Sequence, residues 1–135
     1  MKITVIDGNP SEQSFTAGLV EKYIEGAKGS GHEVRRLNIR DLKFDPNLVE
    51  GYREIQELEP DLIKAQQDIQ WCQHLVLAYP IWWGQMPALL KGFFDRALLP
   101  GFGFKYHKKG PWWDRLLAGR SARPAAQGRM PSGFQ

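Results

Sequence analysis

Small polar side chains follow the first apolar run of the chain, where a turn ends that run and a helical pattern begins. These residues are Asn9, Ser11, Ser14 and Thr16. Free N–H groups and the positive end of the helix dipole bind phosphate at the start of a helix, and hydroxyl groups add donors there. Serine and threonine are equally favoured as ordinary helix caps, so both interpretations stay open. The loop lacks the G-x-G-x-x-G spacing, which disfavours a dinucleotide Rossmann site.

Two adjacent tryptophans stand in a second loop, which comprises Pro80, Ile81, Trp82, Trp83 and Gly84. Such rings can stack on a planar ring system, and a glycine lets the backbone come close to it. Backbone N–H groups of this loop could hydrogen-bond the edge of a flavin and tune its electronics. Core packing or a contact between subunits is the alternative. We favour ligand binding because of where the loop falls in the expected fold.

The elements that position these two loops follow from hydrophobic periodicity. Short β-rich runs predict strands over residues 2–7, 32–39 and 75–79. Helical spacing predicts helices over residues 15–27, before Gln73 and over 87–98, with a weaker one over 52–58. The order β-α-β-α-β-α with right-handed crossovers predicts an α/β, doubly wound parallel sheet with helices on both faces. We assume the strand order 2-1-3, one of the common orders of such sheets. Ligands of such sheets bind at the carboxyl ends of strands one and three, where the two loops meet.

The end of the chain does not continue this pattern. Residues 120–123 stand where a fourth strand should begin, but Pro124, Gly128 and Pro131 follow with almost no β-branched residues. Proline cannot donate to a β-ladder, so we expect no interior strand there. We therefore expect an incomplete domain over residues 1–123, with strands four and five defective or missing, and a disordered tail over 124–135.

Composition excludes several other classes of protein. The 135 residues suit one domain. The net charge of +3 comes mainly from basic residues between 105 and 129, whereas the earlier charges alternate in sign as on solvated helices, which disfavours a nucleic-acid binder. The single cysteine excludes an internal disulfide, and no apolar run approaches the ~20 residues of a membrane span. No residues have metal-ligand or Ser-His-Asp spacing, so no zinc site or hydrolase triad is expected. With no signal peptide, a cytoplasmic protein is the default expectation.

A long segment from Tyr79 to Arg96, together with residues 7–10 and Ser14-Phe15, resembles the NAD(P)H dehydrogenase (quinone) family. The likeness covers nearly everything from Met1 to about Arg123. It implies a flavodoxin-like fold and a homodimeric flavoprotein with NAD(P)H as co-substrate. NAD(P)H would give a hydride to the flavin and leave, and a quinone would then take two electrons in the same pocket. The flavin supplies the reactivity, so no catalytic side chain is expected.

The resemblance also implies roles for individual residues. Ser14, Phe15 and Thr16 resemble the segment that binds the flavin phosphate, and the loop over residues 80–84 resembles the segment along the isoalloxazine. Phe104 and Tyr106 resemble aromatics that one subunit lends to its partner's substrate pocket. The helix from Pro87 to Leu99 resembles the family's dimer helix.

Two departures from the family pattern leave alternatives open. The resemblance implies FAD, but Asn9 stands where some members have a histidine near the pyrophosphate, so FMN stays open as the alternative. Family members continue through a Thr/Gly-rich flavin loop and a fifth strand, and nothing after Ala122 resembles these. We therefore expect this chain to retain flavin weakly and to reduce quinones poorly. The alternative to an enzyme is a non-catalytic truncated partner or an ancillary regulatory subunit, for example of a potassium-efflux system.

Overall fold

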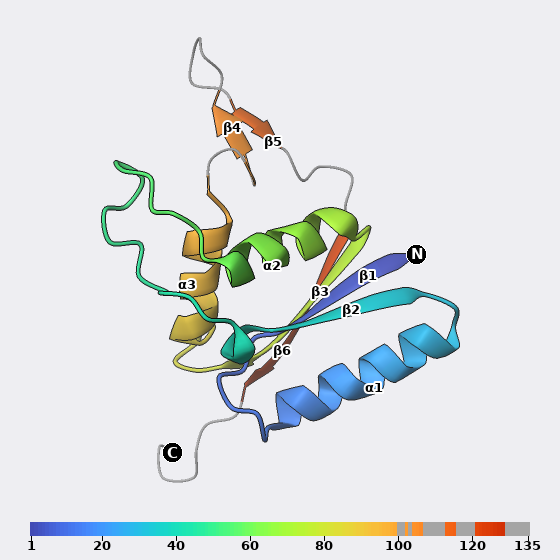
Figure 1. The fold of residues 1–135 in the computed structure, drawn as a ribbon. Coiled ribbons are helices and arrows are strands. Elements are labelled where there is room, and N and C mark those ends of the chain that lie inside the picture. Colours follow the sequence, from blue (N-terminus) through green and yellow to red (C-terminus); the bar gives the residue numbers. More distant parts are fainter. Residues whose placement is uncertain (100–101, 103, 107–112, 116–120, 129–135) are drawn as a thin grey trace.

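A parallel β-sheet forms the middle layer of the computed structural model (Figure 1). The structure describes residues 1–99, 102, 104–106, 113–115 and 121–128, and from residue 104 onward the description covers the backbone. The strands of the sheet are β1 (Lys2–Asp7), β2 (Glu33–Asn38), β3 (His74–Ile81) and β6 (Ser121–Gly128). They lie in the order β2-β1-β3-β6, and each neighbouring pair is parallel. The predicted α/β class and the 2-1-3 order are confirmed.

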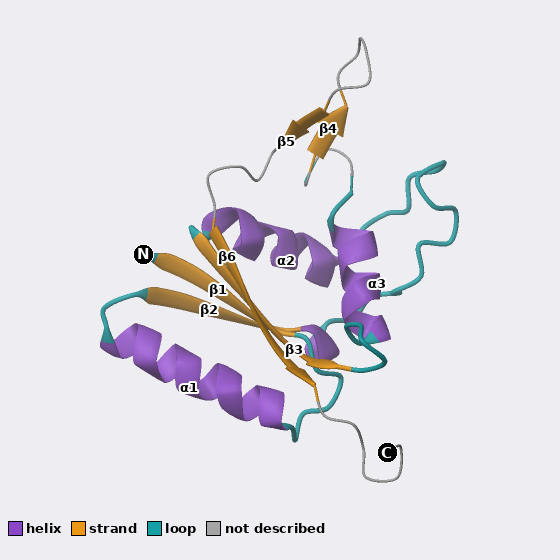
Figure 2. Cartoon of the chain, turned by 180° about the vertical axis from the view of Figure 1, so that it is seen from behind, coloured by secondary structure: helices purple, strands orange, loops and turns teal. Residues whose placement is uncertain are grey.

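Helices cover both faces of this sheet (Figure 2). Helix α1 (Phe15–Gly29) lies on one face, and α2 (Pro60–Trp71) and α3 (Ala88–Ala97) lie on the other. A short 3-10 helix, η1 (Ile39–Asp41), follows β2. Strands β4 (Phe104–Tyr106) and β5 (Trp113–Arg115) form a separate antiparallel pair.

Alternating side chains of β1 build a core on each side of the sheet. Ile3 and Val5 pack toward α1, whereas Ile6 packs toward α2 and α3, and all three are buried. Successive residues of a strand point to opposite faces, so a strand that is covered on both faces is mostly apolar. This requirement explains the continuous apolar run in β3 and the apolar majority of β1, where the buried Thr4 donates a hydrogen bond to the Asp68 carbonyl oxygen.

The fourth strand of the sheet corrects the predicted boundary of the domain at residue 123. Strand β6 crosses residue 123 and includes Pro124, which pairs with Leu77 of β3. Among the described residues β6 is an edge strand, so half of its backbone groups face away from the sheet. Proline is tolerated there because an edge strand can turn the missing N–H outward. Our expectation that no interior strand forms there is compatible with this edge position, but residues 124–128, which we placed in the tail, belong to β6. Residues 129–135 lie outside the described part.

Two smaller expectations also fail. Pro80 does not end the third strand, because β3 continues to Ile81. The pairing of β1 with β3 stops at Ala78, so Pro80 has a paired neighbour on the β6 side and none on the β1 side among the described residues. A proline is tolerated in a strand where one side is unpaired, because a missing N–H on that side costs little. The weak helix over residues 52–58 does not form.

The segment over residues 42–59 is instead irregular and is anchored at its base by one arginine. Arg96 of α3 is fully buried and donates hydrogen bonds to the carbonyl oxygens of Asp45 and Glu57. Its Nη2 atom also lies 2.6 Å from the Glu59 carboxylate. These contacts satisfy backbone groups of a segment that has no ladder of its own.

Candidate functional site

The two loops singled out in the sequence leave neighbouring strands at the same edge of the sheet. The amide of Gly8, directly after β1, donates to the carbonyl oxygen of Ala78 in β3 at 2.7 Å. The strands approach so closely here that a Cβ at position 8 would lie 2.7 Å from Leu90 Cδ2 and 3.2 Å from the Ala78 carbonyl oxygen, so Leu90 would have to shift. The close approach of the two strands thus brings the loop over residues 8–14 beside the end of β3.

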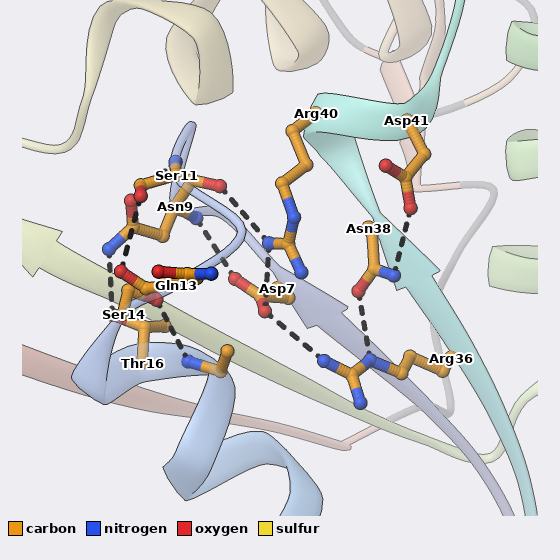
Figure 3. Close-up of polar contacts among 11 residues, drawn as sticks. Asp7, Asn9, Ser11, Gln13, Ser14, Thr16, Arg36, Asn38, Arg40 and Asp41 are labelled. Carbon is orange, nitrogen blue, oxygen red and sulfur yellow. Dashed lines mark hydrogen bonds and ion pairs between the residues drawn. The ribbon is translucent and has the colours of Figure 1, made fainter.

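Asn9 organises the first loop, and Figure 3 shows its contacts. The side chain is largely buried, at 7% exposure. Its Oδ1 atom accepts from the Ser11 amide at 2.8 Å, and its Nδ2 atom donates to Thr16 Oγ1 at 3.2 Å. The Asn9 amide donates to Asp7 Oδ1 at 3.1 Å. Asn9 therefore links the end of β1 to the start of α1 through both its backbone and its side chain.

The hydroxyl groups of the loop have structural partners. Ser14 is the N-cap of α1, and its Oγ accepts from the Ala17 amide at 3.1 Å. Ser11 Oγ donates to the Gln13 carbonyl oxygen at 3.2 Å. Ser14 is therefore a helix cap, as one of the two interpretations predicted. An anion could still bind at the same helix end, because the cap satisfies one of the four backbone N–H groups that lack intrahelical partners. The next residue, Phe15, leaves its ring 64% exposed.

A buried carboxylate with two arginines lies under this loop and was missed in the sequence. Asp7 is fully buried at the end of β1. Arg40 approaches its Oδ2 atom at 3.0 Å and Arg36 at 3.5 Å. An isolated buried carboxylate is costly, so an aspartate that ends a buried strand was itself a signal that cations must lie nearby. Which cations could not be read from the pattern.

The second loop is a tight turn that directly extends β3. Trp82 and Gln85 exchange backbone hydrogen bonds of 2.9 and 3.0 Å. The residues between them, Trp83 and Gly84, have φ values of 54° and 72°. Positive φ at both central positions is the signature of a type I′ turn, which by itself explains the glycine. Trp82 and Trp83 are 49% and 90% exposed, so their rings are available to a ligand.

The remaining site residues divide into three groups. Pro80 is buried and Ile81 is half-buried, which leaves Ile81 the more accessible of the two. Phe104 and Tyr106 lie in β4, but their side chains are outside the description. Leu90 and Phe93 lie in the helix that resembles the family's dimer helix, and both are fully buried within the monomer core. They fill the space against β1 and α2, so they cannot contact a second subunit.

The arrangement offers hydrogen-bond donors at a helix start beside exposed aromatic rings. Within the described residues, no cluster of His, Cys, Asp or Glu could hold a metal ion. None of the helices in that part is long and apolar enough to cross a membrane. The lowered pKa of Glu59 comes mainly from its hydrogen bond with Arg96, in the anchor of the 42–59 segment. The site can therefore bind and orient a ligand, and it shows no acid–base pair of its own.

Comparison with known proteins places this geometry in context. Residues 1–133 match a family described by its flavodoxin-like fold. The ribosyldihydronicotinamide dehydrogenase-like protein traD of Penicillium crustosum is 28% identical over 141 residues, which cover 88% of this chain and 52% of that protein. NAD(P)H dehydrogenase (quinone) 1 of Rattus norvegicus is 25% identical over 134 residues, which cover 82% of this chain and 49% of that protein.

A solved structure gives the same picture. An NADH:FMN oxidoreductase in its apo form superposes with a TM-score of 0.67 at 30% identity. The match covers 97% of this chain and 60% of that one. The chain spans about half the length of the curated relatives it matches.

Proposed function

This chain belongs to the family of proteins with a flavodoxin-like fold, and on that premise we propose that it acts as a flavin-dependent NAD(P)H:quinone oxidoreductase. The observation that carries the proposal is the meeting of two loops at one edge of the sheet, where the Gly8 amide bonds to the Ala78 carbonyl oxygen. One loop offers donors at the start of α1, and the other offers exposed tryptophans. A flavin has a phosphate and a planar ring, which these two features suit.

The phosphate of FAD or FMN would lie at the start of α1. The first N–H groups of a helix lack intrahelical partners, and the helix dipole adds positive potential there. Ser14 and Thr16 would add hydroxyl donors, since each oxygen already accepts a hydrogen bond and keeps its own proton to give. Asn9 and Ser11 would hold the loop around the phosphate.

The ring would lie against the turn after β3. Trp82 and Trp83 expose large apolar surfaces that a ring could cover, and Phe15 exposes another at the start of α1. Pro80, Ile81 and Gly84 would place the backbone along the ring edge. The site would thus offer hydrogen-bond donors to the phosphate of the flavin and exposed aromatic surface to its ring.

A bound flavin would supply the chemistry of hydride transfer from NAD(P)H and two-electron reduction of a quinone. The chain's own residues would bind and orient it, and they would exclude water from one side of the ring. NAD(P)H and the quinone would use the same open side in turn, with Phe104 and Tyr106 contributing to this pocket across a homodimer interface.

Flavin titration tests the first part of the proposal. Quenching of FMN or FAD fluorescence should report binding to the wild-type chain, and the two dissociation constants should show which flavin is preferred. The double variant Trp82→Ala/Trp83→Ala should bind more weakly, by about tenfold or more, because stacking is worth about 1 kcal/mol or more for each ring. Ile63→Ala is the control, because Ile63 is also an exposed apolar residue but lies in α2, outside the proposed site. A folded wild-type chain that binds neither flavin would contradict the proposal.

Turnover tests the second part. With excess flavin, NADH- or NADPH-driven reduction of a simple quinone should follow ping-pong kinetics, because both substrates use one pocket. Intersecting lines in a double-reciprocal plot would instead require both substrates to be bound together. Flavin binding without any turnover would favour the non-catalytic alternative.

A further inference from the structure

Arg40 is nearly enclosed by the structure although it carries a charge. It extends from η1 toward the first loop, and only 10% of its side chain is exposed (Figure 3). Its Nη1 atom lies 3.0 Å from Asp7 Oδ2 and donates to the Asn9 carbonyl oxygen at 3.2 Å. Its Nε atom is buried and has no hydrogen-bond partner among the described residues. An arginine buried in this way needs partners that compensate for the loss of its hydration, and here Asp7 and the Asn9 carbonyl oxygen are those partners.

The contact with Asn9 decides which groups the first loop presents. Asn9 has two oxygens, and both are occupied: Arg40 donates to the carbonyl oxygen, and the Ser11 amide donates to Oδ1. An unpaired oxygen that faced the loop interior would repel a phosphate. With both oxygens held as acceptors, the loop presents donors instead, as an anion site requires.

We propose that Arg40 is a positioning residue for the flavin phosphate: by holding the Asn9 carbonyl oxygen, it fixes the loop over residues 8–14 in its donor-presenting conformation. The inference rests on the proposed flavin site. Asp7 neutralises the guanidinium at 3.0 Å, so the effect of Arg40 is on the shape of the loop rather than on long-range attraction of the phosphate.

Arg36 provides a matched control for this distinction. It approaches the same Asp7 oxygen at 3.5 Å, but its Nε atom donates to Asn38 Oδ1, and it makes no hydrogen bond to Asn9. Arg36→Met therefore removes one positive charge beside Asp7 and leaves the Asn9 carbonyl contact in place. Arg40→Met removes the same charge together with that contact.

The test compares FMN with riboflavin, which has the same ring without the phosphate. Dissociation constants are measured by fluorescence quenching, with circular dichroism to check folding. In Arg40→Met the constant for FMN should rise about tenfold or more, as the loss of one charge-assisted hydrogen bond at the phosphate would cause. The constant for riboflavin should change by less than about twofold, and Arg36→Met should leave both within about twofold.

A second variant controls for destabilisation of the fold, because Arg40→Met leaves the buried carboxylate of Asp7 with Arg36 as its one remaining cation. Asp7→Asn/Arg40→Met removes the carboxylate together with its partner, and it should show the same selective loss of FMN relative to the wild type. Equal weakening of FMN and riboflavin in both variants, or an equal loss in Arg36→Met, would overturn the inference. So would unchanged FMN binding in a folded Arg40 variant. If the folded wild type binds neither flavin, the proposed function itself fails, which is a distinct result.

Discussion

Trp83 holds a backbone conformation that bulky residues rarely adopt, with φ at 54°. It occupies the first central position of the turn after β3, where asparagine or glycine has the lowest conformational cost. Its side chain is 90% exposed, so burial within the monomer does not compensate for this strain. Strained residues persist where they serve a function, and the indole of Trp83 is the large surface beside the proposed flavin ring.

Replacement of Trp83 should therefore separate stability from binding. Trp83→Asn creates an Asn-Gly turn, and we expect the free energy of unfolding in urea to rise by roughly 0.5–1 kcal/mol. Flavin affinity should fall in the same variant because the stacking surface is lost. Trp82→Ala is the control: the backbone of Trp82 is not in the left-handed region, so no gain in stability is expected. A less stable Trp83→Asn variant would show that the indole supports the fold instead.

At the scale of elements, two helical glycines have opposite surroundings. A Cβ at Gly92 of α3 would lie 2.5 Å from Pro46 Cβ and 2.8 Å from the Pro46 carbonyl oxygen. The missing side chain thus lets α3 pack directly on the 42–59 segment. A Cβ at Gly26 of α1 would meet nothing within 4 Å.

Alanine at these two positions should have effects of opposite sign. Gly92→Ala forces α3 away from Pro46 and should lower the free energy of unfolding by about 1–3 kcal/mol, as overpacking does. Gly26→Ala should raise it by up to about 1 kcal/mol, because alanine is the better helix former. Urea denaturation of both variants measures the difference. A Gly92→Ala variant as stable as Gly26→Ala would mean that α3 does not pack on the segment at this distance.

The anchor of the 42–59 segment should make stability depend on pH. The hydrogen bond from Arg96 is the main reason that the pKa of Glu59 lies below its ordinary value of 4.5, and a hydrogen bond from the Asp45 amide also lowers the pKa against the opposing effect of burial. The folded chain therefore binds this proton more weakly than the unfolded chain does. The stabilisation is complete above pH 4.5 and is lost as the pH falls through the folded pKa.

Urea unfolding of the wild type and Glu59→Gln across this pH range tests the effect. Glu59→Gln should be less stable at neutral pH, because the buried Arg96 loses its charged partner. Its stability should then fall less than that of the wild type as the pH drops below 4.5. Parallel stability curves for the two proteins would show that Glu59 does not titrate with folding.

At the scale of the whole molecule, apolar side chains remain exposed on the 42–59 segment. Val49, Tyr52 and Ile55 are 68%, 60% and 95% exposed. On and beside α3, the side chains of Met86, Phe94 and Leu98 are half-buried. Exposed apolar groups that gather in one region are typical of association surfaces. They supply a surface for the proposed homodimer that Leu90 and Phe93, being in the core, cannot provide.

Sedimentation equilibrium should therefore find a dimer at micromolar concentration. Ile55→Glu should weaken it while leaving the free energy of unfolding within about 0.5 kcal/mol, because surface substitutions of this kind perturb the fold little. Lys43→Glu is a control for added negative charge in the same segment. A wild-type monomer at these concentrations would contradict the proposed dimer, and an unchanged Ile55→Glu dimer would place the interface elsewhere.

The sequence by itself determined the secondary structure of β1, α1, β2, α2, β3 and α3, because local periodicity needs no knowledge of distant partners. The 2-1-3 strand order was assumed from the common orders of such sheets, and the tertiary structure confirmed it. The Ser14 cap was likewise readable, because its partner Ala17 is three residues away. The local pattern did not predict the strand through Pro124. Whether a proline is tolerated in a strand depends on which side of the strand has a neighbour, and that is a property of the sheet.

Only the tertiary structure decided how the site is supported. Arg40 reaches Asn9 across 31 positions in the sequence, and Arg96 reaches Asp45 across 51. No periodicity encodes such contacts, because they depend on where β1, η1 and α3 come to lie in space. The same holds for the burial of Leu90 and Phe93, whose apolar pattern suits a core and an interface equally well. Side-chain type fixes what a residue can do, and the packing of distant elements fixes which partner it meets.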